Sequence, residues 1–437
     1  MDKFPLSPQQ EKYLKSDRIL QQNRKTTFWS PFVAEIVGQM DFSLFKQAIH
    51  HLVQNLDILR SSFFEEDGRY YQAIQANVEY GIKLSDLKNA SQTEQDQAIK
   101  NALVEIYHRE RTDYNAPLWE VELFTLSESK HVLVFTAHHA IADGFGFAIL
   151  MDTISKYYGA LAEGKTPLRP SLQYSDYIND YEQRLKADDF KDTVEIWSGL
   201  LPSASHSPGT RKIVKNSQRT LSIGSELLAQ IKDVCNGNGI FFSSFLYASY
   251  CLILNKKLGR DEMLVEALSI GRSDKKFAGT FGCFTASFPI VVKFPPEFTL
   301  LEIIAPVNEL VITSLGHEFP PHMIYDSSTC VSRLNYMRAI GPRPERVFDR
   351  ELNYVVDLNR RMESGVGWIS SNLSSYIYFI EGESGLNLYV RAPEDDEEKN
   401  LLAEWTCSSL RAFWQNLSHK PDGLQQKWSE FCSGTIP

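Results

Sequence analysis

The run from His138 to Gly144 has the pattern H-H-x-x-x-D-G, in which two histidines stand shortly before an Asp-Gly pair. The apolar residues at 132–135 predict a strand before it, and the pattern from about 145 to 161 predicts a helix after it. A neutral imidazole held where a strand ends can take a proton from an attacking amine or hydroxyl. The N-terminus of the following helix offers unpaired backbone N–H groups to a developing oxyanion. We therefore interpret His139 as a catalytic histidine.

The alternative is ordinary packing, because histidine pairs also occur as hydrogen-bonded core residues. His50-His51 forms such a pair in a predicted helix, with no Asp-Gly after it. The second ring nitrogen of His139 needs an acceptor to hold one tautomer, and a nearby backbone carbonyl is a candidate. Gly144 has no Cβ and lets a substrate approach the backbone closely. Asp143, if it points into the protein, needs a cationic partner, because an unpaired buried carboxylate is costly.

Other catalytic patterns are missing from the sequence. It contains no G-x-S-x-G, no cysteine beside His139, no P-loop, no G-x-G-x-x-G and no H-E-x-x-H. These observations favour direct transfer from an activated acyl donor, without a covalent enzyme intermediate, a metal or a nucleotide.

Composition sets wider limits. The chain has 437 residues, with 45 basic and 55 acidic residues and a formal net charge of −10, which argues against nucleic acid as the main partner. Six cysteines without C-x-x-C pairs predict reduced, mostly buried thiols rather than a disulfide framework or a zinc site. The N-terminus is polar and no stretch reaches the roughly 18 apolar residues that span a bilayer. We expect a cytoplasmic protein with no membrane partner.

The order of predicted elements indicates an α/β sandwich in two similar lobes. The first half alternates between helices at 43–59 and 94–106 and strands at 70–74, 119–124 and 132–136. A long helix at 174–197 and an exposed connection at 203–218 follow. The remaining predicted elements are helices at 225–235, 243–258 and 397–417, and strands at 264–268, 288–293, 352–356, 375–379 and 386–390. We place the boundary so that residues 1–172 form the N-terminal lobe and residues 173–437 the C-terminal lobe.

Several segments together resemble the condensation domains of nonribosomal peptide synthetases, within the chloramphenicol acetyltransferase-like superfamily of acyltransferases. Besides H-H-x-x-x-D-G, the matching segments are Pro5–Gln10, His51–Phe63, Pro117–Trp119, Gln173–Tyr177 with Trp197, Gly271-Arg272, Gly282–Pro289, His317–Pro321 and Leu352–Tyr354. The resemblance implies two acetyltransferase-like lobes forming a V-shaped pseudo-dimer around a central tunnel.

The resemblance also implies roles for individual residues. His139 is the active-site histidine, His138 a supporting neighbour, and Asp143 a structural residue paired with Arg272. Gly144 presents its N–H to the thioester carbonyl, and Asn353 lies near the reacting groups. The resemblance further implies that the protein binds no cofactor of its own. The acyl or aminoacyl group arrives on the phosphopantetheine arm of an acyl or peptidyl carrier protein, supplied in trans to a stand-alone monomeric enzyme, and is passed to a small-molecule or carrier-bound amine or alcohol.

The sequence departs from the family pattern at two points. Ala286 replaces a common Asn, and Glu11-Lys12-Tyr13 replaces the usual Arg-Leu-Trp; we expect neither to touch the histidine. Because carrier proteins are acidic, three basic clusters are candidates for docking, each set against an ordinary solvated surface. They are Lys256-Lys257 with Arg260, Lys275-Lys276, and Arg343 with Arg346.

Two other functions stay open. An acyl-CoA-dependent O- or N-acyltransferase of the same superfamily is the first, although the D-F-G-W-G motif of plant-type members is absent. A non-catalytic domain that recruits another enzyme is the second, although such domains usually have a damaged histidine motif. Neither the acyl donor nor the acceptor is specified by the sequence.

Overall fold

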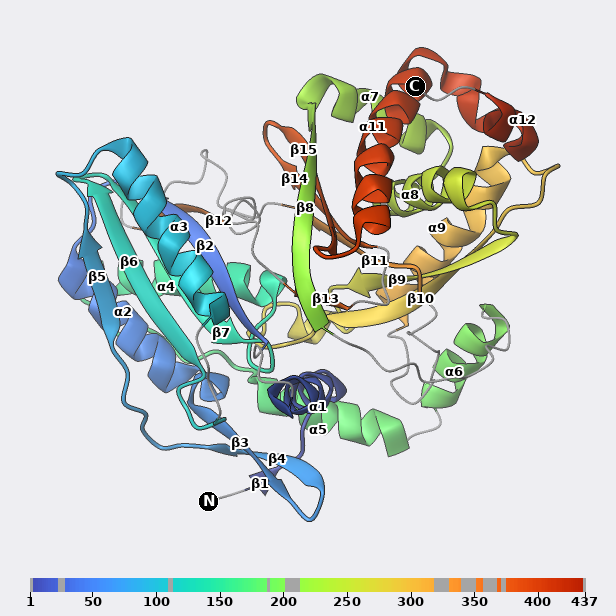
Figure 1. Ribbon diagram of the computed structural model, residues 1–437. Coiled ribbons are helices and arrows are strands. Elements are labelled where there is room, and N and C mark those ends of the chain that lie inside the picture. Colours follow the sequence, from blue (N-terminus) through green and yellow to red (C-terminus); the bar gives the residue numbers. More distant parts are fainter. Residues whose placement is uncertain are drawn as a thin grey trace. The chain divides into compact units, whose positions relative to one another are not determined.

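The computed structural model describes residues 3–22, 28–108, 113–186, 189–200, 213–317, 330–338, 351–356, 368–370 and 375–434. Its helices are α1 (Pro8–Gln22), α2 (Phe42–Asn55), η1 (Asp57–Arg60), α3 (Gln92–His108), α4 (Gly144–Ala162), α5 (Tyr174–Lys186), α6 (Asp189–Leu200), α7 (Ser225–Gly237), α8 (Phe242–Leu258), η2 (Lys275–Phe277), α9 (Leu300–Gly316), α11 (Glu397–His419), η4 (Pro421–Gln425) and α12 (Trp428–Ser433) (Figure 1). Its strands are β1 (Lys3–Phe4), β2 (Trp29–Val37), β3 (Ser61–Glu66), β4 (Arg69–Ile74), β5 (Ile82–Asp86), β6 (Trp119–Ser127), β7 (Lys130–His138), β8 (Ile213–Gly224), β9 (Glu262–Ser269), β10 (Ala286–Lys293), β11 (Ser332–Arg338), β12 (Asn353–Val356), β13 (Trp368–Ser370), β14 (Ser375–Gly382) and β15 (Gly385–Pro393).

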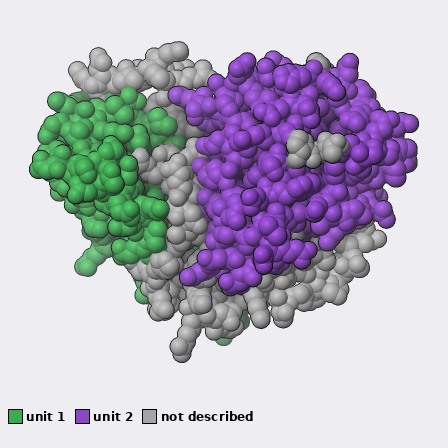
Figure 2. Space-filling model, turned by 45° about the horizontal axis from the view of Figure 1, so that its top comes forward, with its two compact units in different colours: residues 1–190, 274–285, 339–364 green, residues 191–273, 286–338, 365–437 purple. Residues whose placement is uncertain are grey.

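The chain folds into two compact units, coloured green and purple in Figure 2. Unit 1 contains residues 1–190, 274–285 and 339–364, and unit 2 contains residues 191–273, 286–338 and 365–437. These units divide the chain differently from the boundary predicted at 172/173. Helix α5 belongs to unit 1 because its buried tyrosines pack in the same core as α2 and α4, and two later segments of the chain return to that unit.

Unit 1 is built on a five-stranded mixed sheet in the order β12-β2-β7-β6-β5. Alternate residues of β7 face opposite sides of the sheet. Phe135 stacks on Phe147 of α4 at a centroid distance of 6.0 Å, whereas Val134 and Thr136 line a pocket that residues of α3 also line. Helices therefore cover both faces, which explains why β7 is buried from His131 to His138 instead of alternating between buried and exposed residues.

Unit 2 contains a seven-stranded mixed sheet in the order β10-β9-β11-β14-β15-β8-β13. Helices α7, α8, α9 and α11 pack against it (Figure 1) and share one core with its apolar residues. The predicted α/β class is confirmed in both units.

Some predicted elements differ from the observed ones. The exposed connection predicted at 203–218 is wrong from Ile213 onward, where β8 pairs with β15 in antiparallel register. The part of the connection at 203–212 lies outside the described residues. In place of the single helix predicted at 174–197, the structure has α5 and α6 on either side of residues 187–188.

Among the described helices, no single one is long and apolar enough to cross a membrane. One bent pair, α7 with α8, passes that test by length and composition alone. Most of α8 is buried within unit 2.

Candidate active site

The H-H-x-x-x-D-G run forms the junction between β7 and α4. His138 is the last residue of β7, and Ile141 N–H donates to the His138 carbonyl at 3.0 Å, which closes a tight turn. Helix α4 begins at Gly144, with Asp143 as its N-cap. The geometry of an α-helix leaves the first backbone N–H groups without intrahelical acceptors. The strand, turn and helix predicted around the motif are therefore all present.

The imidazole of His139 is held in one tautomer. Its Nδ1 lies 3.1 Å from the carbonyl oxygen of Ala142, and a carbonyl only accepts, so Nδ1 carries the proton. This is the type of acceptor considered from the sequence. In the neutral ring, Nε2 then carries the lone pair, which is the form that a general base requires.

Tyr13 of α1 stacks on the His139 ring, with centroids 4.8 Å apart and planes 9° from parallel. Phe32 of β2 meets the same ring edge-on at 6.4 Å. The expectation that the Glu11-Lys12-Tyr13 departure does not touch the histidine is therefore wrong. The sequence offered no contact information here, because α1 and β7 are more than a hundred residues apart in the chain.

His138 is fully buried and adopts the opposite tautomer. Its Nδ1 accepts from the Ala140 N–H at 3.1 Å, so the proton resides on Nε2, which donates to Asp17 Oδ2 at 2.6 Å. Both ring nitrogens are thus engaged, and neither offers a lone pair to a substrate. Sequence reasoning missed Asp17, since a single acid in a predicted polar N-terminal segment gives no signal of this contact.

Asp143 is fully buried and accepts three backbone hydrogen bonds. Oδ1 accepts from Gly146 N–H at 2.5 Å, and Oδ2 accepts from the N–H groups of Phe284 and Thr285 at 2.7 and 3.0 Å. Backbone donors therefore satisfy a large part of the carboxylate, as is common for buried acids. Asp143 is structural in this geometry, and it ties the start of α4 to the 281–285 segment.

The predicted Asp143–Arg272 pair joins residues of different units and stays a prediction. Arg272 is buried, and its guanidinium donates to the Ile270 carbonyl at 3.2 Å. Three backbone N–H groups already bind the Asp143 carboxylate, so its burial does not by itself require a cationic partner.

Tyr174 of α5 holds the 281–285 segment in place. Its hydroxyl donates to the Cys283 carbonyl and lies 2.8 Å from the Ser7 hydroxyl before α1. A Cβ on Gly282 would lie 2.1 Å from Cδ2 of the Tyr174 ring, so only glycine permits this approach. Burial raises the pKa of Tyr174 well above its usual value, which keeps the hydroxyl protonated as a donor.

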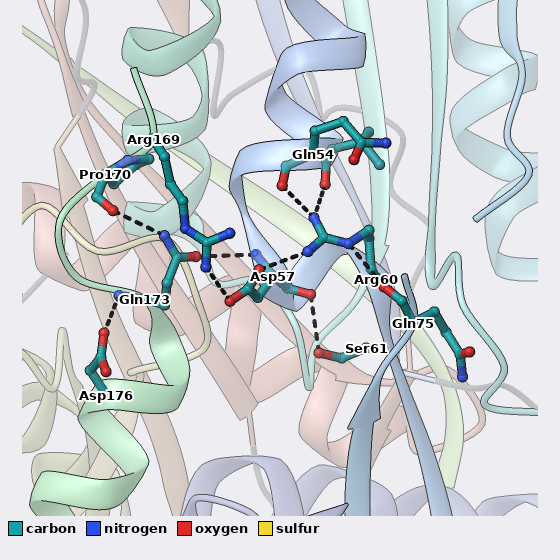
Figure 3. A network of polar contacts seen from close by, with 10 residues as sticks. Gln54, Asp57, Arg60, Ser61, Gln75, Arg169, Pro170, Gln173 and Asp176 are labelled. Carbon is teal, nitrogen blue, oxygen red and sulfur yellow. Dashed lines mark hydrogen bonds and ion pairs between the residues drawn. The ribbon is translucent and has the colours of Figure 1, made fainter. Parts of the chain in front are cut away.

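A second network, drawn in Figure 3, joins two more of the recognised segments. Arg60 donates to Asp57 Oδ1 at 2.7 Å and to the carbonyls of Val53, Gln54 and Gln75. Asp57 N–H donates in turn to the side chain of Gln173, just before α5. Arg60 is buried and its contacts lie within this network, so it acts in the scaffold of unit 1 rather than at the histidines.

Asn353 does not lie where it was predicted. It opens β12 and pairs with Val37, which pairs with Lys130 at the start of β7. His138 ends the same strand, about 26 Å away at roughly 3.3 Å per residue. This register disagrees with a position beside the reacting groups. The tripeptide Leu-Asn-Tyr occurs twice, at 334–336 and 352–354, and the first copy lies in β11 of unit 2, so the tripeptide alone was an ambiguous signal.

Two of the three basic clusters are engaged in local contacts. Lys256 donates to the carbonyls of Phe431 and Gly434, and Lys276 pairs with Asp180 and Asp274. These contacts favour local structural roles for both lysines. Arg343 and Arg346 lie outside the described residues. Within the described ranges, no group of three His, Cys, Asp or Glu side chains is arranged to hold a metal ion.

Comparison with known proteins identifies the family. A model of the condensation domain matches residues 1–328. The chain belongs to the condensation-domain family. Bacitracin synthase 1 of Bacillus licheniformis is 26% identical over 333 residues, which are 74% of this chain and 6% of that synthase, so the chain spans only a small part of its relative.

Solved condensation-domain structures share the two-lobed acetyltransferase-like fold. SgcC5 of Streptomyces globisporus matches with a TM-score of 0.77 and 17% identity, over 96% of this chain and 100% of its own. The starter condensation domain of the rhizomide synthetase RzmA matches with a TM-score of 0.78 and 15% identity, over 100% and 98%. The fold and family inferred from the sequence are thereby confirmed.

Proposed function

We propose that this condensation domain transfers an acyl or aminoacyl group from a carrier-tethered thioester to an amine or hydroxyl acceptor, with His139 assisting deprotonation of the acceptor. The family supplies the class of reaction, since condensation domains form amide or ester bonds from substrates tethered to phosphopantetheine. One observation carries the proposal to this chain: Nδ1 of His139 is bound to the Ala142 carbonyl, which leaves the lone pair on Nε2.

The proposed step balances without a cofactor. The acceptor nitrogen or oxygen attacks the thioester carbon and gives its proton to Nε2 of His139. The carbonyl oxygen becomes an oxyanion, which the Gly144 N–H at the start of α4 stabilises. The C–S bond then breaks, the new amide or ester leaves, and the thiolate of the phosphopantetheine arm takes up the proton.

We propose a separate acyl or peptidyl carrier protein as the donor. An acyl-CoA donor is the alternative, because it presents the same thioester on a similar arm, and the rhizomide starter domain was solved with C8-CoA. Hydroxyl acceptors are also included in the test, because SgcC5 was solved with a naphthyl ethanediol.

Intact-mass spectrometry of the donor tests the proposal. Acyl-loaded carrier proteins and the matching acyl-CoAs are offered separately, each with a panel of amines and alcohols. Loss of the acyl mass from the carrier with a matching new product supports carrier-dependent condensation. Turnover with acyl-CoA at equal efficiency would instead assign a general acyltransferase.

The recruitment alternative is tested in the same assay. If the native carrier and acceptor are present and the acyl mass on the carrier does not change, the catalytic proposal is wrong. The chain would then be a recruiting domain that retains its histidines.

A further inference from the structure

The buried carboxylate of Asp17 connects α1 to both histidines of the motif. Asp17 Oδ2 accepts from His138 Nε2–H at 2.6 Å, and Oδ1 accepts from Phe28 N–H at 2.7 Å. The Phe28 carbonyl accepts from His139 N–H at 2.8 Å. These contacts close a ring that runs from Asp17 to His138, along the chain to His139, through Phe28 and back to Asp17.

The hydrogen-bond partners of the His138 imidazole determine which of its nitrogens carries the proton. The Ala140 N–H only donates, so Nδ1 of His138 accepts from it and carries no proton. The imidazole must then carry its proton on Nε2, which points at Asp17. The Ala140 N–H and the Asp17 carboxylate therefore favour the same tautomer from opposite edges of the imidazole. The His138 side chain and its carbonyl together bind Ala140 and Ile141, the residues that follow His139.

We propose that Asp17 is a positioning residue: it holds His138 in the Nε2–H tautomer and thereby fixes the turn that carries His139. Asp17 acts through His138 and Phe28, and nothing in the proposal requires it to touch a substrate. The catalytic consequence rests on the proposed function of His139, whereas the tautomer assignment does not.

The chemistry of the site explains why a carboxylate is needed. Two N–H donors, from His138 and Phe28, face its two oxygens. An amide offers one oxygen and one NH2 group, so Asp17→Asn sets a donor against a donor in either orientation. Asp17 is fully buried, so water does not replace the lost acceptor there.

Histidine tautomers in the whole chain can be read from long-range 1H–15N spectra of protein labelled on its ten histidines. The His138 signals are identified by their loss in His138→Gln. In the wild type we expect His138 as a pure Nε2–H tautomer with a strongly hydrogen-bonded proton. A pure Nδ1–H tautomer or an equal mixture would overturn the inference, whether or not any acyl transfer is seen.

The catalytic consequence is measured with Asp17→Asn in the single-turnover transfer assay. We expect the rate constant to fall on the order of tenfold or more, with KM unchanged, because orientation of the base is lost while substrate binding is retained. In the His138→Gln background, Asp17→Asn should lower the rate constant much less, because the His138 imidazole through which Asp17 acts is already absent. Additive losses in the double variant, or a folded Asp17→Asn protein with the wild-type rate, would overturn the positioning role.

Asp57→Asn is the matched control, because Asp57 is a shielded aspartate of the same unit that binds Arg60 and not the motif. It should lower the stability while the histidine spectrum and the transfer rate stay as in the wild type. If no donor supports transfer in any variant, the proposed function fails while the spectra still decide the tautomer of His138. If Asp17→Asn does not fold, the wild-type spectrum and the His138→Gln rate keep the inference testable.

Discussion

The rings of Tyr13 and His139 stack face to face, 4.8 Å between centroids and 9° from parallel, although the two residues are more than a hundred positions apart in the sequence. An aromatic face against the imidazole restricts the rotation of the ring, while hydrogen bonds to its nitrogens form in the plane of the ring. Tyr13 therefore belongs with the Ala142 carbonyl among the groups that orient His139.

Replacing Tyr13 tests the stacking contact. Tyr13→Phe and Tyr13→Trp keep an aromatic face and should retain most of the transfer rate. Tyr13→Leu should lower the rate constant by up to about tenfold, since an aromatic pair contributes roughly 0.5–1.5 kcal/mol beyond its buried area. Single-turnover kinetics measure this directly, and equal rates in the Leu and Phe variants would contradict the stacking role.

Asp143→Asn should destabilise the protein strongly. Three N–H groups point at its two oxygens, and an amide nitrogen cannot accept from any of them. We expect urea unfolding to show a loss of about 2–4 kcal/mol, from the cap and at least one buried unsatisfied donor.

Asp41→Asn is the control for Asp143. Asp41 also caps a helix, but among the described residues its carboxylate accepts from Ser43 and Leu44 of its own helix alone, and Asn is as good a cap as Asp. That variant should be close to neutral. Equal losses at both positions would mean that the bonds to Phe284 and Thr285 add nothing.

Gly282→Ala should disturb the 281–285 segment because the new Cβ would collide with the Tyr174 ring. Overpacking of this kind costs about 1–3 kcal/mol. Gly279→Ala lies in the same stretch of chain, and a Cβ there meets nothing within 4 Å, so it should be nearly neutral. Denaturation of both variants side by side checks the contrast, and a harmless Gly282→Ala would show that the close approach is not required.

Arg60→Met should cost about 3–5 kcal/mol of unfolding free energy, because it removes the buried one of the two arginines that bind Asp57 and takes a donor from three backbone carbonyls. Arg169 binds the other oxygen of the same carboxylate from an exposed position. Arg169→Met should therefore cost less than about 1 kcal/mol. If chemical denaturation gave the two variants equal stability, the buried Arg60 would contribute no more to stability than the exposed Arg169 in the network of Figure 3.

Burial lowers the pKa of His131, at the start of β7, below its ordinary value near 6.5. Below that ordinary value the unfolded chain takes up a proton that the folded protein does not. Stability contributed by the neutral ring is therefore present above about pH 6.5 and is lost as the pH falls below it. His131→Gln should lose less stability than the wild type between about pH 7 and 5, as measured by urea unfolding at each pH. A wild-type slope in His131→Gln would contradict this account.

The local part of the site was predictable because it is continuous in sequence. The apolar run before His138, the turn and the start of α4 follow from periodicity and from the Asp-Gly pair, and the carbonyl partner of His139 lies three residues away. The start of helix α9 also has a readable sequence signal, the capping box formed by Thr299 and Glu302.

The remainder depends on contacts between distant segments. Asp17 reaches His138, and Phe284 reaches Asp143, across more than a hundred residues, and no pattern in a single sequence encodes those pairings. Asn353 was misplaced for the same reason, since the register of β12 on β2 decides which end of the sheet it occupies. The beginning of β8 is polar, which is typical of a connection. Its backbone pairing with β15 nevertheless makes it a strand, and the sequence does not reveal that partner.

The most direct test of the central claim is the single-turnover acyl transfer rate of His139→Asn. The Asn side-chain NH2 can keep the bond to the Ala142 carbonyl that Nδ1 now makes, while the Nε2 lone pair is removed. The account predicts a folded protein, with a wild-type melting transition, whose transfer rate falls on the order of a hundredfold or more. A wild-type transfer rate in that folded variant would contradict the assignment of His139 as the base.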